Sequence, residues 1–355
     1  MKIKYYILVG LISFLGACKK NNDKPTENAQ DQDSNPYVAP KWHSIGSGLP
    51  NNTNNAVLNL IALSDSCLSS YCYSMGMYNT INKGISWNQT ANNSVIGGRI
   101  LSYTSSGDTI YAGNEVRGVF MSTNKGSSWS MISNGFPAGI SNYVTGIYSI
   151  KKVGPYIFIA TTSGVFRASL NGTNMVSVNN GLPLTVGTQG YPKLYVSNIE
   201  NIQNYIYITT AAGIYKSTDY GNTWTLSNSG MPAVIYDSFY GNYSNIGSKL
   251  IYGSFFYLYV ATRGAGVYYS SDLGVSWQSM NSGLSNLDIL YMTNIGDYYY
   301  VINSQYEIYV CNTLNISPTW SKMTSDGLPA GLITSICSSR NKLFVATPIS
   351  VYTFE

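Results

Sequence analysis

An eight-residue pattern that ends in tryptophan recurs along the chain, and it constrains the fold more than any other feature. Its residue types are Ser or Thr, any residue, Asp or Asn, any residue, Gly, any residue, Ser or Thr, and Trp. Clear copies begin at Thr80, Ser122, Ser217 and Ser270. Two worn copies begin at Ser169, where the tryptophan is missing, and at Asn312, where one residue is inserted before Trp320. Intervals of about 40 to 50 residues between copies are typical of structural repeats such as propeller blades.

This pattern resembles the Asp-box, also called the BNR repeat, of β-propellers in the sialidase-like superfamily. A short Asp or Asn side chain can accept hydrogen bonds from backbone N–H groups in a turn, and glycine adopts the positive φ that the turn requires. The tryptophan then buries a large ring against neighbouring strands. We therefore interpret the following residues as structural: Asn82, Gly84, Trp87, Asn124, Gly126, Trp129, Asp219, Gly221, Trp224, Asp272, Gly274 and Trp277. The resemblance implies that the boxes lie on the face away from any ligand site.

Strand-like segments and a recurring exit sequence flank each copy. Upstream runs such as 156–161 and 205–209 are rich in aromatic and β-branched residues, as strands are. A glycine and an apolar pair follow, for example Gly164-Val165-Phe166, which places the box at the next hairpin turn. Downstream of the tryptophan comes a Gly-Leu-Pro type of segment, as at 181–183. Glycine and proline there end one sheet and start the connection to the next.

The two ends of the chain carry complementary parts of one repeat unit. The segment 41–50 contains a tryptophan strand and a Gly-Leu-Pro exit with nothing before them, whereas 332–354 supplies three earlier strands and stops before its tryptophan. Pairing the N-terminal strand with the C-terminal blade would close a ring and remove open sheet edges. The sequence therefore predicts an all-β fold, a seven-bladed β-propeller of Asp-box repeats over residues 41–355.

The first forty residues have the pattern of an export signal followed by a tether. Lys2 and Lys4 precede a short apolar run at 5–14, which is typical of a signal peptide and too short to span a bilayer. The stretch 15–18, Leu-Gly-Ala-Cys, resembles the lipobox of bacterial lipoproteins, which implies a signal peptide over 1–17 and a lipid on Cys18. Polar residues dominate 18–40, which predicts a disordered tether. We expect a lipid-anchored protein of the bacterial cell envelope, on the periplasmic or the surface side of the outer membrane.

Composition argues against several classes of function. A net charge of +4, with no basic run longer than Lys19-Lys20, gives no footprint for nucleic acid. The single histidine, His43, leaves little material for zinc sites or histidine-dependent catalysis, so we expect no metal and no cofactor. The cysteines that remain after Cys18 are Cys67, Cys72, Cys311 and Cys337. Outside the cytoplasm disulfides can persist, and the sequence leaves open both disulfide pairing and buried free thiols.

The ligand-binding surface is expected at the mouth of the central channel. Propellers usually bind ligands on the face formed by the loops that connect the outer strand of one blade to the inner strand of the next, together with the middle hairpin loops. The longest of these loops lie at about 178–195 and 228–248 and are rich in Tyr, Asn, Ser and Gly, a composition that suits recognition of sugars or protein surfaces. The candidate binding residues are Tyr191, Tyr195, Tyr236, Asp237, Tyr240 and Tyr243.

Three functions are consistent with these features. The first is a non-catalytic binding or scaffolding protein that recognises a glycan or a protein. The second, implied by the resemblance, is a glycoside hydrolase of the sialidase kind, which needs an arginine triad and catalytic acids; here 99–101 reads Arg-Ile-Leu and lacks the proline of that family's Arg-Ile-Pro signature. The third is an assembly factor for a membrane complex, which predicts an extended protein-binding face. We predict the first and assign no catalytic residue.

Overall fold

The computed structural model describes residues 39–50, 56–62, 67–92, 97–116, 118–132, 146–186, 192–232, 243–251, 255–314, 317–339 and 341–355. The chain divides into two units, Met1–Ala39 and Pro40–Glu355, and every described strand belongs to the second. The predicted signal peptide, Cys18 and most of the predicted tether lie outside the described residues. Across the part of the chain that is described, no helix is long and apolar enough to cross a membrane.

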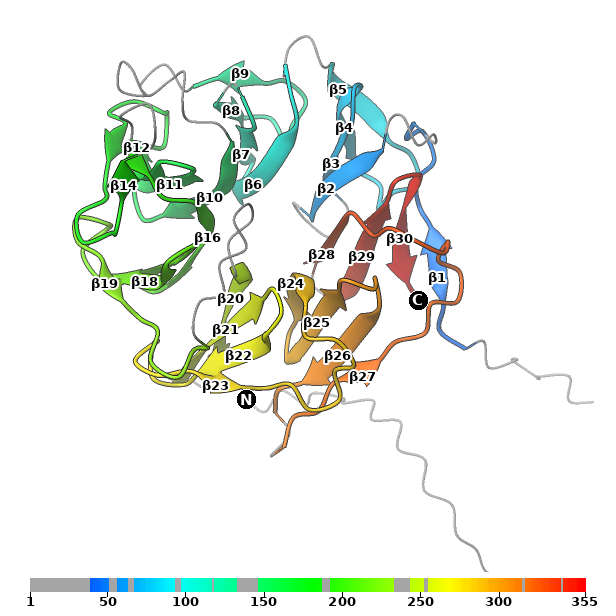
Figure 1. The fold of residues 1–355 in the computed structure, drawn as a ribbon. Coiled ribbons are helices and arrows are strands. Elements are labelled where there is room, and N and C mark those ends of the chain that lie inside the picture. The colour runs from blue at the N-terminus through cyan, green and yellow to red at the C-terminus, as the bar shows by residue number, and fades with distance from the viewer. Residues whose placement is uncertain are drawn as a thin grey trace, which may run out of the picture. The chain divides into compact units, whose positions relative to one another are not determined.

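Within the described residues, the strands form seven four-stranded antiparallel sheets, which we call blades I to VII (Figure 1). Blades I to III contain β2 (Val57–Ala62), β3 (Leu68–Cys72), β4 (Gly76–Thr80) and β5 (Asn88–Asn92); β6 (Ile100–Ser106), β7 (Thr109–Asn114), β8 (Val119–Ser122) and β9 (Ser130–Met131); and β10 (Ile147–Val153), β11 (Tyr156–Thr161), β12 (Gly164–Ser169) and β13 (Val176–Ser177). Blades IV and V contain β16 (Val196–Ile202), β17 (Tyr205–Thr210), β18 (Gly213–Ser217) and β19 (Thr225–Leu226); and β20 (Tyr243–Ile251), β21 (Phe255–Thr262), β22 (Gly266–Ser270) and β23 (Gln278–Ser279). Blades VI and VII contain β24 (Ile289–Ile295), β25 (Tyr298–Asn303), β26 (Ile308–Asn312) and β27 (Ser321–Lys322); and β28 (Ser335–Ser339), β29 (Lys342–Thr347), β30 (Ser350–Phe354) and β1 (Trp42–Ser44). A further pair, β14 (Thr185–Val186) and β15 (Pro192–Lys193), lies between blades III and IV in the sequence.

The blades are arranged in a ring around their first strands. Each of β2, β6, β10, β16, β20, β24 and β28 contacts the first strand of the blade on either side, and β28 contacts β2 (Figure 1). Side-chain hydroxyls link some of these neighbours: Ser149 Oγ accepts the Ile199 N–H at 3.1 Å, and Ser335 Oγ accepts the Leu60 N–H at 3.1 Å. The predicted seven-bladed propeller is therefore confirmed.

Blade VII is assembled from both ends of the propeller sequence. Strand β1 pairs with β30 in antiparallel register, with Trp42 opposite Phe354 and Ser44 opposite Tyr352. The rings of Trp42 and Phe354 lie 5.2 Å apart. This pairing confirms the predicted closure, because the N-terminal strand supplies the outer strand that the C-terminal segment lacks.

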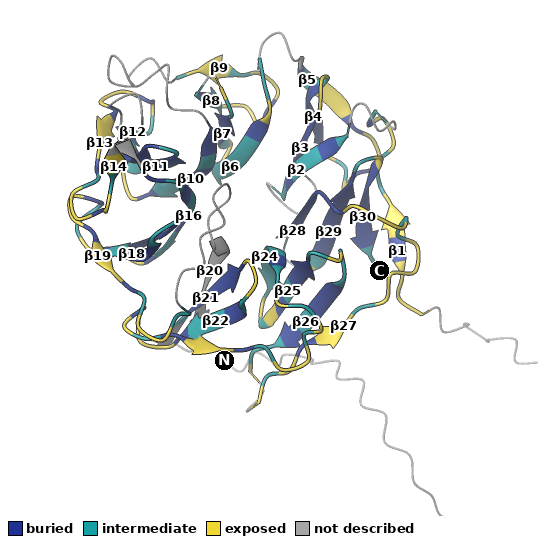
Figure 2. Cartoon of the chain, viewed as in Figure 1, coloured by how far each residue is buried: buried dark blue, intermediate teal, exposed yellow. Residues whose placement is uncertain are grey.

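The middle strands of the blades are buried on both faces. In β11, β17 and β29 every residue after the first is buried, because each sheet packs between two neighbouring sheets (Figure 2). One apolar cluster joins Phe158 of blade III to Ile206 of blade IV, and another joins Ile302 of blade VI to Val345 of blade VII. In these three strands, aromatic, aliphatic and β-branched residues therefore fill both sides instead of alternating with polar ones.

The repeated pattern forms the hairpin turn between the third and fourth strands. Asp219 Oδ1 accepts hydrogen bonds from the Thr223 N–H at 2.9 Å and from the Ser217 hydroxyl at 2.8 Å. The Gly221 N–H donates to Ser217 Oγ at 2.8 Å, and Gly221 adopts a φ of 81°. The same three hydrogen bonds occur at 80–86, 122–128 and 270–276. We call 80–87, 122–129, 217–224 and 270–277 the box turns.

Most of the tryptophans connect one blade to the preceding one. The Trp224 indole N–H donates to Val178 O at 2.7 Å, and its backbone N–H donates to Asn180 O at 2.9 Å. Gly181 adopts a φ of 89°, and a Cβ there would lie 2.2 Å from Trp224 O, so the close approach requires glycine. Equivalent glycine–tryptophan pairs are Gly48 with Trp87, Gly230 with Trp277, Gly283 with Trp320 and Gly327 with Trp42. The Gly-Leu-Pro segments therefore do more than end a sheet, because they also hold the tryptophan of the next blade.

Trp129 in blade II is an exception to this arrangement. Its side chain is only half-buried, and its indole N–H donates to Gly126 O at 3.1 Å within its own turn. Blade III has no tryptophan at this place, and Val176 on its outer strand is 44% exposed. The expected burial of the ring against neighbouring strands is therefore fulfilled at Trp87, Trp224 and Trp277 and only in part at Trp129.

Cys72, Cys311 and Cys337 of the propeller are free thiols. Cys67, Cys72 and Cys311 are buried, and Cys337 is half-buried. Burial raises the pKa of Cys72 to about 12 and that of Cys311 to about 11. Both side chains therefore stay protonated at neutral pH, which lowers their reactivity toward oxidants and metals.

Candidate functional site

The channel mouth is formed where the first strands of the blades begin. Five of these strands shift register after their first residue, so that one residue on each leaves the regular ladder with the second strand. The displaced residues are Leu101, Tyr148, Ser197, Ser244 and Leu290. Such β-bulges aim side chains away from the sheet, and they recur here at one end of the channel.

An aromatic pair lies at this mouth between blades III and IV. Tyr195 directly precedes β16, and its ring meets the ring of Tyr148 edge to face at a centroid distance of 4.6 Å. Both side chains are half-buried. Two tyrosines in this arrangement offer flat apolar surface together with hydroxyl groups, which suits contact with a sugar or a polypeptide.

Tyr195 is the predicted binding residue whose side chain the structure describes. Tyr243 begins β20, so its backbone also lies at the channel mouth. Tyr191, Tyr236, Asp237 and Tyr240 lie outside the described residues. The assignment of these six residues to a ligand therefore stays a prediction.

Exposed apolar side chains lie on both faces of the ring, and the loops of the channel mouth carry five of them. They lie between the second and third strands or before the first strand of blades I, II, VI and VII, with exposed fractions of 49% for Tyr73, 59% for Val116, 37% for Leu287, 47% for Leu332 and 39% for Ile349. Backbone hydrogen bonds connect two of these loops, because the Tyr73 N–H donates to Ala56 O at 2.8 Å and the Val57 N–H donates to Pro348 O at 3.2 Å. Blades VII and I thus present neighbouring apolar groups at the mouth.

Three described carboxylates of this face are held in ion pairs. Glu115 Oε2 lies 2.7 Å from Arg99 Nε, and Glu307 Oε1 lies 2.6 Å from Lys322 Nζ. Asp288 is paired with Arg263. Among the described residues, no group of three or more His, Cys, Asp and Glu side chains could hold a metal ion.

Glu307 illustrates what these pairs do to acid–base chemistry. The hydrogen bond from Lys322, together with one from Asn303 at 2.8 Å, lowers the pKa of Glu307 to about 2. The Ser285 hydroxyl also donates to Glu307 Oε2, at 2.9 Å. A carboxyl group in this state stays ionised at physiological pH and has no proton to give as a general acid.

A polar cavity of about 360 Å³ lies further along the channel, among the first strands of blades I to IV. Its lining includes Tyr103, Ser149 and Asn198. Lys151 Nζ and Glu200 Oε1 approach within 2.7 Å there, and both side chains are largely shielded from solvent. The two charges compensate each other, so this part of the channel carries a polar but locally balanced surface.

Sequence reasoning missed two features of this face. Tyr148 was not selected because it lies inside a strand-like run, and only the bulge that follows Ile147 distinguishes it. The apolar loop residues were missed because the search favoured the longest loops, whereas Tyr73, Val116 and Ile349 lie in short turns. A single apolar residue within two positions of a glycine or serine in a short connection was the available signal.

Comparisons with known proteins give the fold of this chain but no family. No family model matches the sequence, and no curated protein matches it. Among solved structures, YCF48 bound to D1 peptide is similar with a TM-score of 0.61 at 14% identity, covering 88% of this chain and 96% of that chain. An ancestral GH74 enzyme gives a TM-score of 0.63 at 18% identity, covering 89% of this chain and 46% of the enzyme. The WD40 propeller domain of Doa1 gives 0.62 at 10% identity, covering 89% and 97%. The fold is thus shared by binding proteins and by hydrolases.

Proposed function

We propose that this chain is a non-catalytic binding propeller of the bacterial cell envelope that recognises a protein partner at the channel mouth. The observation that carries this proposal is the set of exposed apolar side chains on that face, over blades VI, VII, I and II. Exposed apolar groups on neighbouring loops of the mouth favour a protein surface over a free glycan, because sugars present mostly hydroxyl groups. The pair of Tyr148 and Tyr195 extends the aromatic surface toward blade IV.

One of two similar folds has been solved with a peptide. YCF48 has been solved with a D1 peptide, and Doa1 carries a WD40 propeller. These likenesses are at 14% and 10% identity, so they supply the architecture and not the ligand. The partner proposed here therefore depends on the residues of this chain.

Glycoside hydrolysis is the alternative that the GH74 likeness raises. Hydrolysis by the usual route needs two carboxyl groups about 5 to 10 Å apart, one of them able to hold a proton. On the described loops of the channel mouth, Glu115, Asp288 and Glu307 are each engaged by a basic side chain. This arrangement supports binding over catalysis.

The lipid anchor and the envelope location are part of the same proposal. Acylation at Cys18 would place the propeller on a membrane surface at the end of the 18–40 tether. The proposal also interprets the box turns as Asp-box repeats. Cys18→Ser is expected to move the protein from the membrane fraction to the soluble fraction and to abolish incorporation of an alkyne-labelled fatty acid. Unchanged labelling of this variant would contradict the anchor while leaving the binding face untouched.

Site-specific photocrosslinking tests the binding face. A benzoylphenylalanine at Tyr73 is expected to form one discrete protein adduct in the producing cell, and the matched probe at Ile85, an exposed residue of a box turn, is expected to form none. The adduct should disappear when Ile349→Asp is added, because the charge falls within the same apolar surface. Equal adducts at both positions, or glycan-array binding that depends on Tyr148 and Tyr195 without any adduct, would contradict a protein partner.

A further inference from the structure

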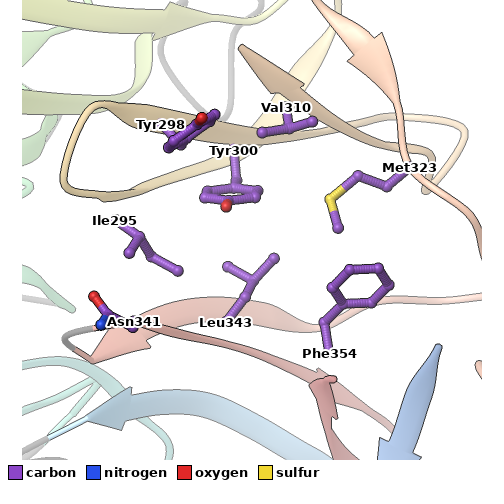
Figure 3. Close-up of a pocket in the computed structure, with 8 residues that line it drawn as sticks. All are labelled: Ile295, Tyr298, Tyr300, Val310, Met323, Asn341, Leu343 and Phe354. Atoms are coloured by element: carbon purple, nitrogen blue, oxygen red, sulfur yellow. The ribbon is translucent and has the colours of Figure 1, made fainter. Parts of the chain in front are cut away.

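A pocket of about 250 Å³ lies in the seam between blades VI and VII (Figure 3). Its walls are Ile295, Tyr298, Tyr300 and Val310 from blade VI, with Leu343 and Phe354 from blade VII. We call it the seam pocket. Ile295 ends its inner strand and Tyr298 begins the next strand, so the pocket lies at the end of the blades away from the channel mouth. It is therefore separate from the binding face proposed above.

In other seams, the equivalent space receives the box turn of the following blade. Between blades III and IV, the ring of Tyr220 packs edge to face on Tyr156 with centroids 6.0 Å apart. The carbonyl of Tyr220 accepts a hydrogen bond from Arg167 Nη1 at 2.6 Å. A bulky side chain and one backbone carbonyl from the turn thus fill this seam.

A donor of the preceding blade binds a carbonyl of the turn between the third and fourth strands in further seams. The Tyr207 hydroxyl donates to Leu273 O at 2.8 Å between blades IV and V. The Tyr111 hydroxyl donates to Leu170 O at 2.7 Å between blades II and III. In both cases the acceptor is a leucine of the turn, and the donor is the third residue of the second strand. The contact is therefore a recurring feature of the blade-to-blade interface.

The strand registers show that the seam pocket is the same place in blade VI. Tyr298 lies opposite Ile295 as Tyr156 lies opposite Val153. Tyr300 lies opposite Val310 in the way that Tyr207 lies opposite Lys216. Tyr300 thus corresponds to the tyrosines that bind a turn carbonyl in other seams, and Tyr298 corresponds to the ring that supports Tyr220.

The donor at this place is unused. In the part of the chain that the structure describes, the Tyr300 hydroxyl has no hydrogen-bond partner, and in Figure 3 it points into the space between the two blades. Burial raises the pKa of Tyr300, so the hydroxyl keeps its proton and remains a donor. Tyr298 is 47% exposed, and no box-turn ring covers it.

The pocket is open because of how blade VII is built. Strands β30 and β1 come from distant parts of the sequence, so no hairpin turn connects them. Lys41 and Glu355 instead pair their backbones, at 2.8 and 3.1 Å. In each of blades I to VI, one continuous segment of the chain connects the third strand to the fourth. Blade VII has no such segment to place against blade VI.

We propose that the seam pocket binds a reverse turn of a partner polypeptide, with a tyrosine or leucine in the pocket and its carbonyl on Tyr300. The expected occupant is inferred from the turns of this chain. In other seams, these turns place such residues against the preceding blade as part of a continuous blade-to-blade interface. The volume suits a side chain rather than a single water, which takes up roughly 30 Å³. The partner would dock on the face opposite the channel mouth.

A peptide with the sequence of residues 217–224, Ser-Thr-Asp-Tyr-Gly-Asn-Thr-Trp, is the probe that tests this site. Calorimetry on the full chain is expected to show saturable binding of one peptide per chain. A control peptide with alanine in place of the tyrosine should bind at least tenfold more weakly, because the pocket is largely apolar. Tyr300→Phe should weaken binding about fivefold, the effect of one lost hydrogen bond.

Filling the pocket gives the decisive variant. Val310→Trp is expected to lower the affinity for the probe peptide more than tenfold, whereas Leu226→Trp, on the exposed outer strand of blade IV, should leave it unchanged. Equal binding to the wild type and to Val310→Trp, or no binding up to about 1 mM peptide, would overturn the proposal. If Val310→Trp does not fold, an unchanged affinity of Tyr300→Phe overturns it instead.

Self-association is a competing outcome of the same experiment. If sedimentation shows a dimer that Tyr300→Phe or Val310→Trp dissociates, a second copy of this chain occupies the pocket, and the assignment to a different partner is wrong. Crosslinking from Tyr73 reports on the channel mouth alone. Failure of either site can therefore be distinguished from failure of the other.

Discussion

Trp224 and Trp129 stand at the same place in nearly identical turns, yet they hold the molecule together differently. Trp224 is 3% exposed and donates its indole N–H to the preceding blade at Val178 O. Trp129 is half-buried and donates to Gly126 in its own turn. The turns themselves have the same hydrogen bonds around Asp219 and Asn124. The difference must come from outside the repeated pattern.

The segment that precedes each blade accounts for the difference. Blade IV follows Gly181-Leu182-Pro183, and Gly181 closely approaches the Trp224 carbonyl. Blade II follows 93–99, Asn-Ser-Val-Ile-Gly-Gly-Arg, which has no Gly-Leu-Pro. The box pattern therefore determines a turn, whereas the exit segment of the previous blade determines whether the tryptophan connects two blades.

Removing each tryptophan should give the largest contrast. Trp224→Ala deletes a buried ring and leaves the Val178 carbonyl without its donor, which is expected to cost about 3 to 5 kcal/mol in the free energy of unfolding. Trp129→Ala should cost only about 1 to 2 kcal/mol, because its ring is already half-exposed. Urea unfolding followed by circular dichroism measures both. Equal losses would show that the inter-blade hydrogen bond does not set the difference.

Substitution of the glycine tests the other side of the contact. Gly181→Ala requires a side chain at a φ of 89° and places a Cβ 2.2 Å from Trp224 O. We expect a loss of about 2 to 3 kcal/mol from backbone strain and displacement of the tryptophan. Gly107→Ala is the matched control, since its φ is 61° but a Cβ there meets nothing within 4 Å. A comparable loss in both variants would mean that φ alone, and not the contact with Trp224, requires glycine at 181.

The smallest expected effect is that of acid, which should distinguish the box turn that contains Asp219 from the one that contains Asn124. Burial pushes the pKa of Asp219 upward, but hydrogen bonds from Thr223 and Ser217 outweigh it and lower that pKa below 3.8. A carboxyl with a lowered pKa contributes stability above pH 4 that is lost as the pH falls through its folded-state pKa. Asp219→Asn should therefore flatten the decrease in stability below pH 4 by less than about 1 kcal/mol, because solvent screens the group. Asn124→Ala should leave the pH dependence unchanged while lowering stability at every pH.

Much of the fold could be predicted because two features of the repeat specify it, namely the box pattern and the spacing between copies. The box pattern fixes each hairpin turn, and the spacing between copies leaves room for four strands. The closure was predictable because Trp42 and 332–354 are parts of one unit. The hydrogen bond that Asn228 makes across its sheet could not be predicted. Asn228 Oδ1 accepts the Ile214 N–H at 2.8 Å, and Ile214 lies fourteen positions earlier on a strand of the same blade. Local patterns do not reveal a contact made by the side chain across its own sheet.

The candidate site was predictable only in outline. Loop length and composition directed attention to the channel mouth, and Tyr195 does lie there. The exposed groups at Val116 and Ile349 come from short turns of different blades, and their common face follows from the ring and not from the sequence. The seam pocket depends on the lack of a hairpin turn between β30 and β1, which becomes visible only when the other seams are compared with it.

The bond between the Ser44 and Ser350 hydroxyls, 2.8 Å long, joins residues 306 positions apart. During synthesis, β1 is made first and must stay unpaired until β30 has been made. For that whole interval the nascent chain carries an open strand edge, the kind of edge at which unfolded proteins associate wrongly. The speed of synthesis, and any chaperone that shields the leading segment, thereby help to decide how much of this protein folds correctly.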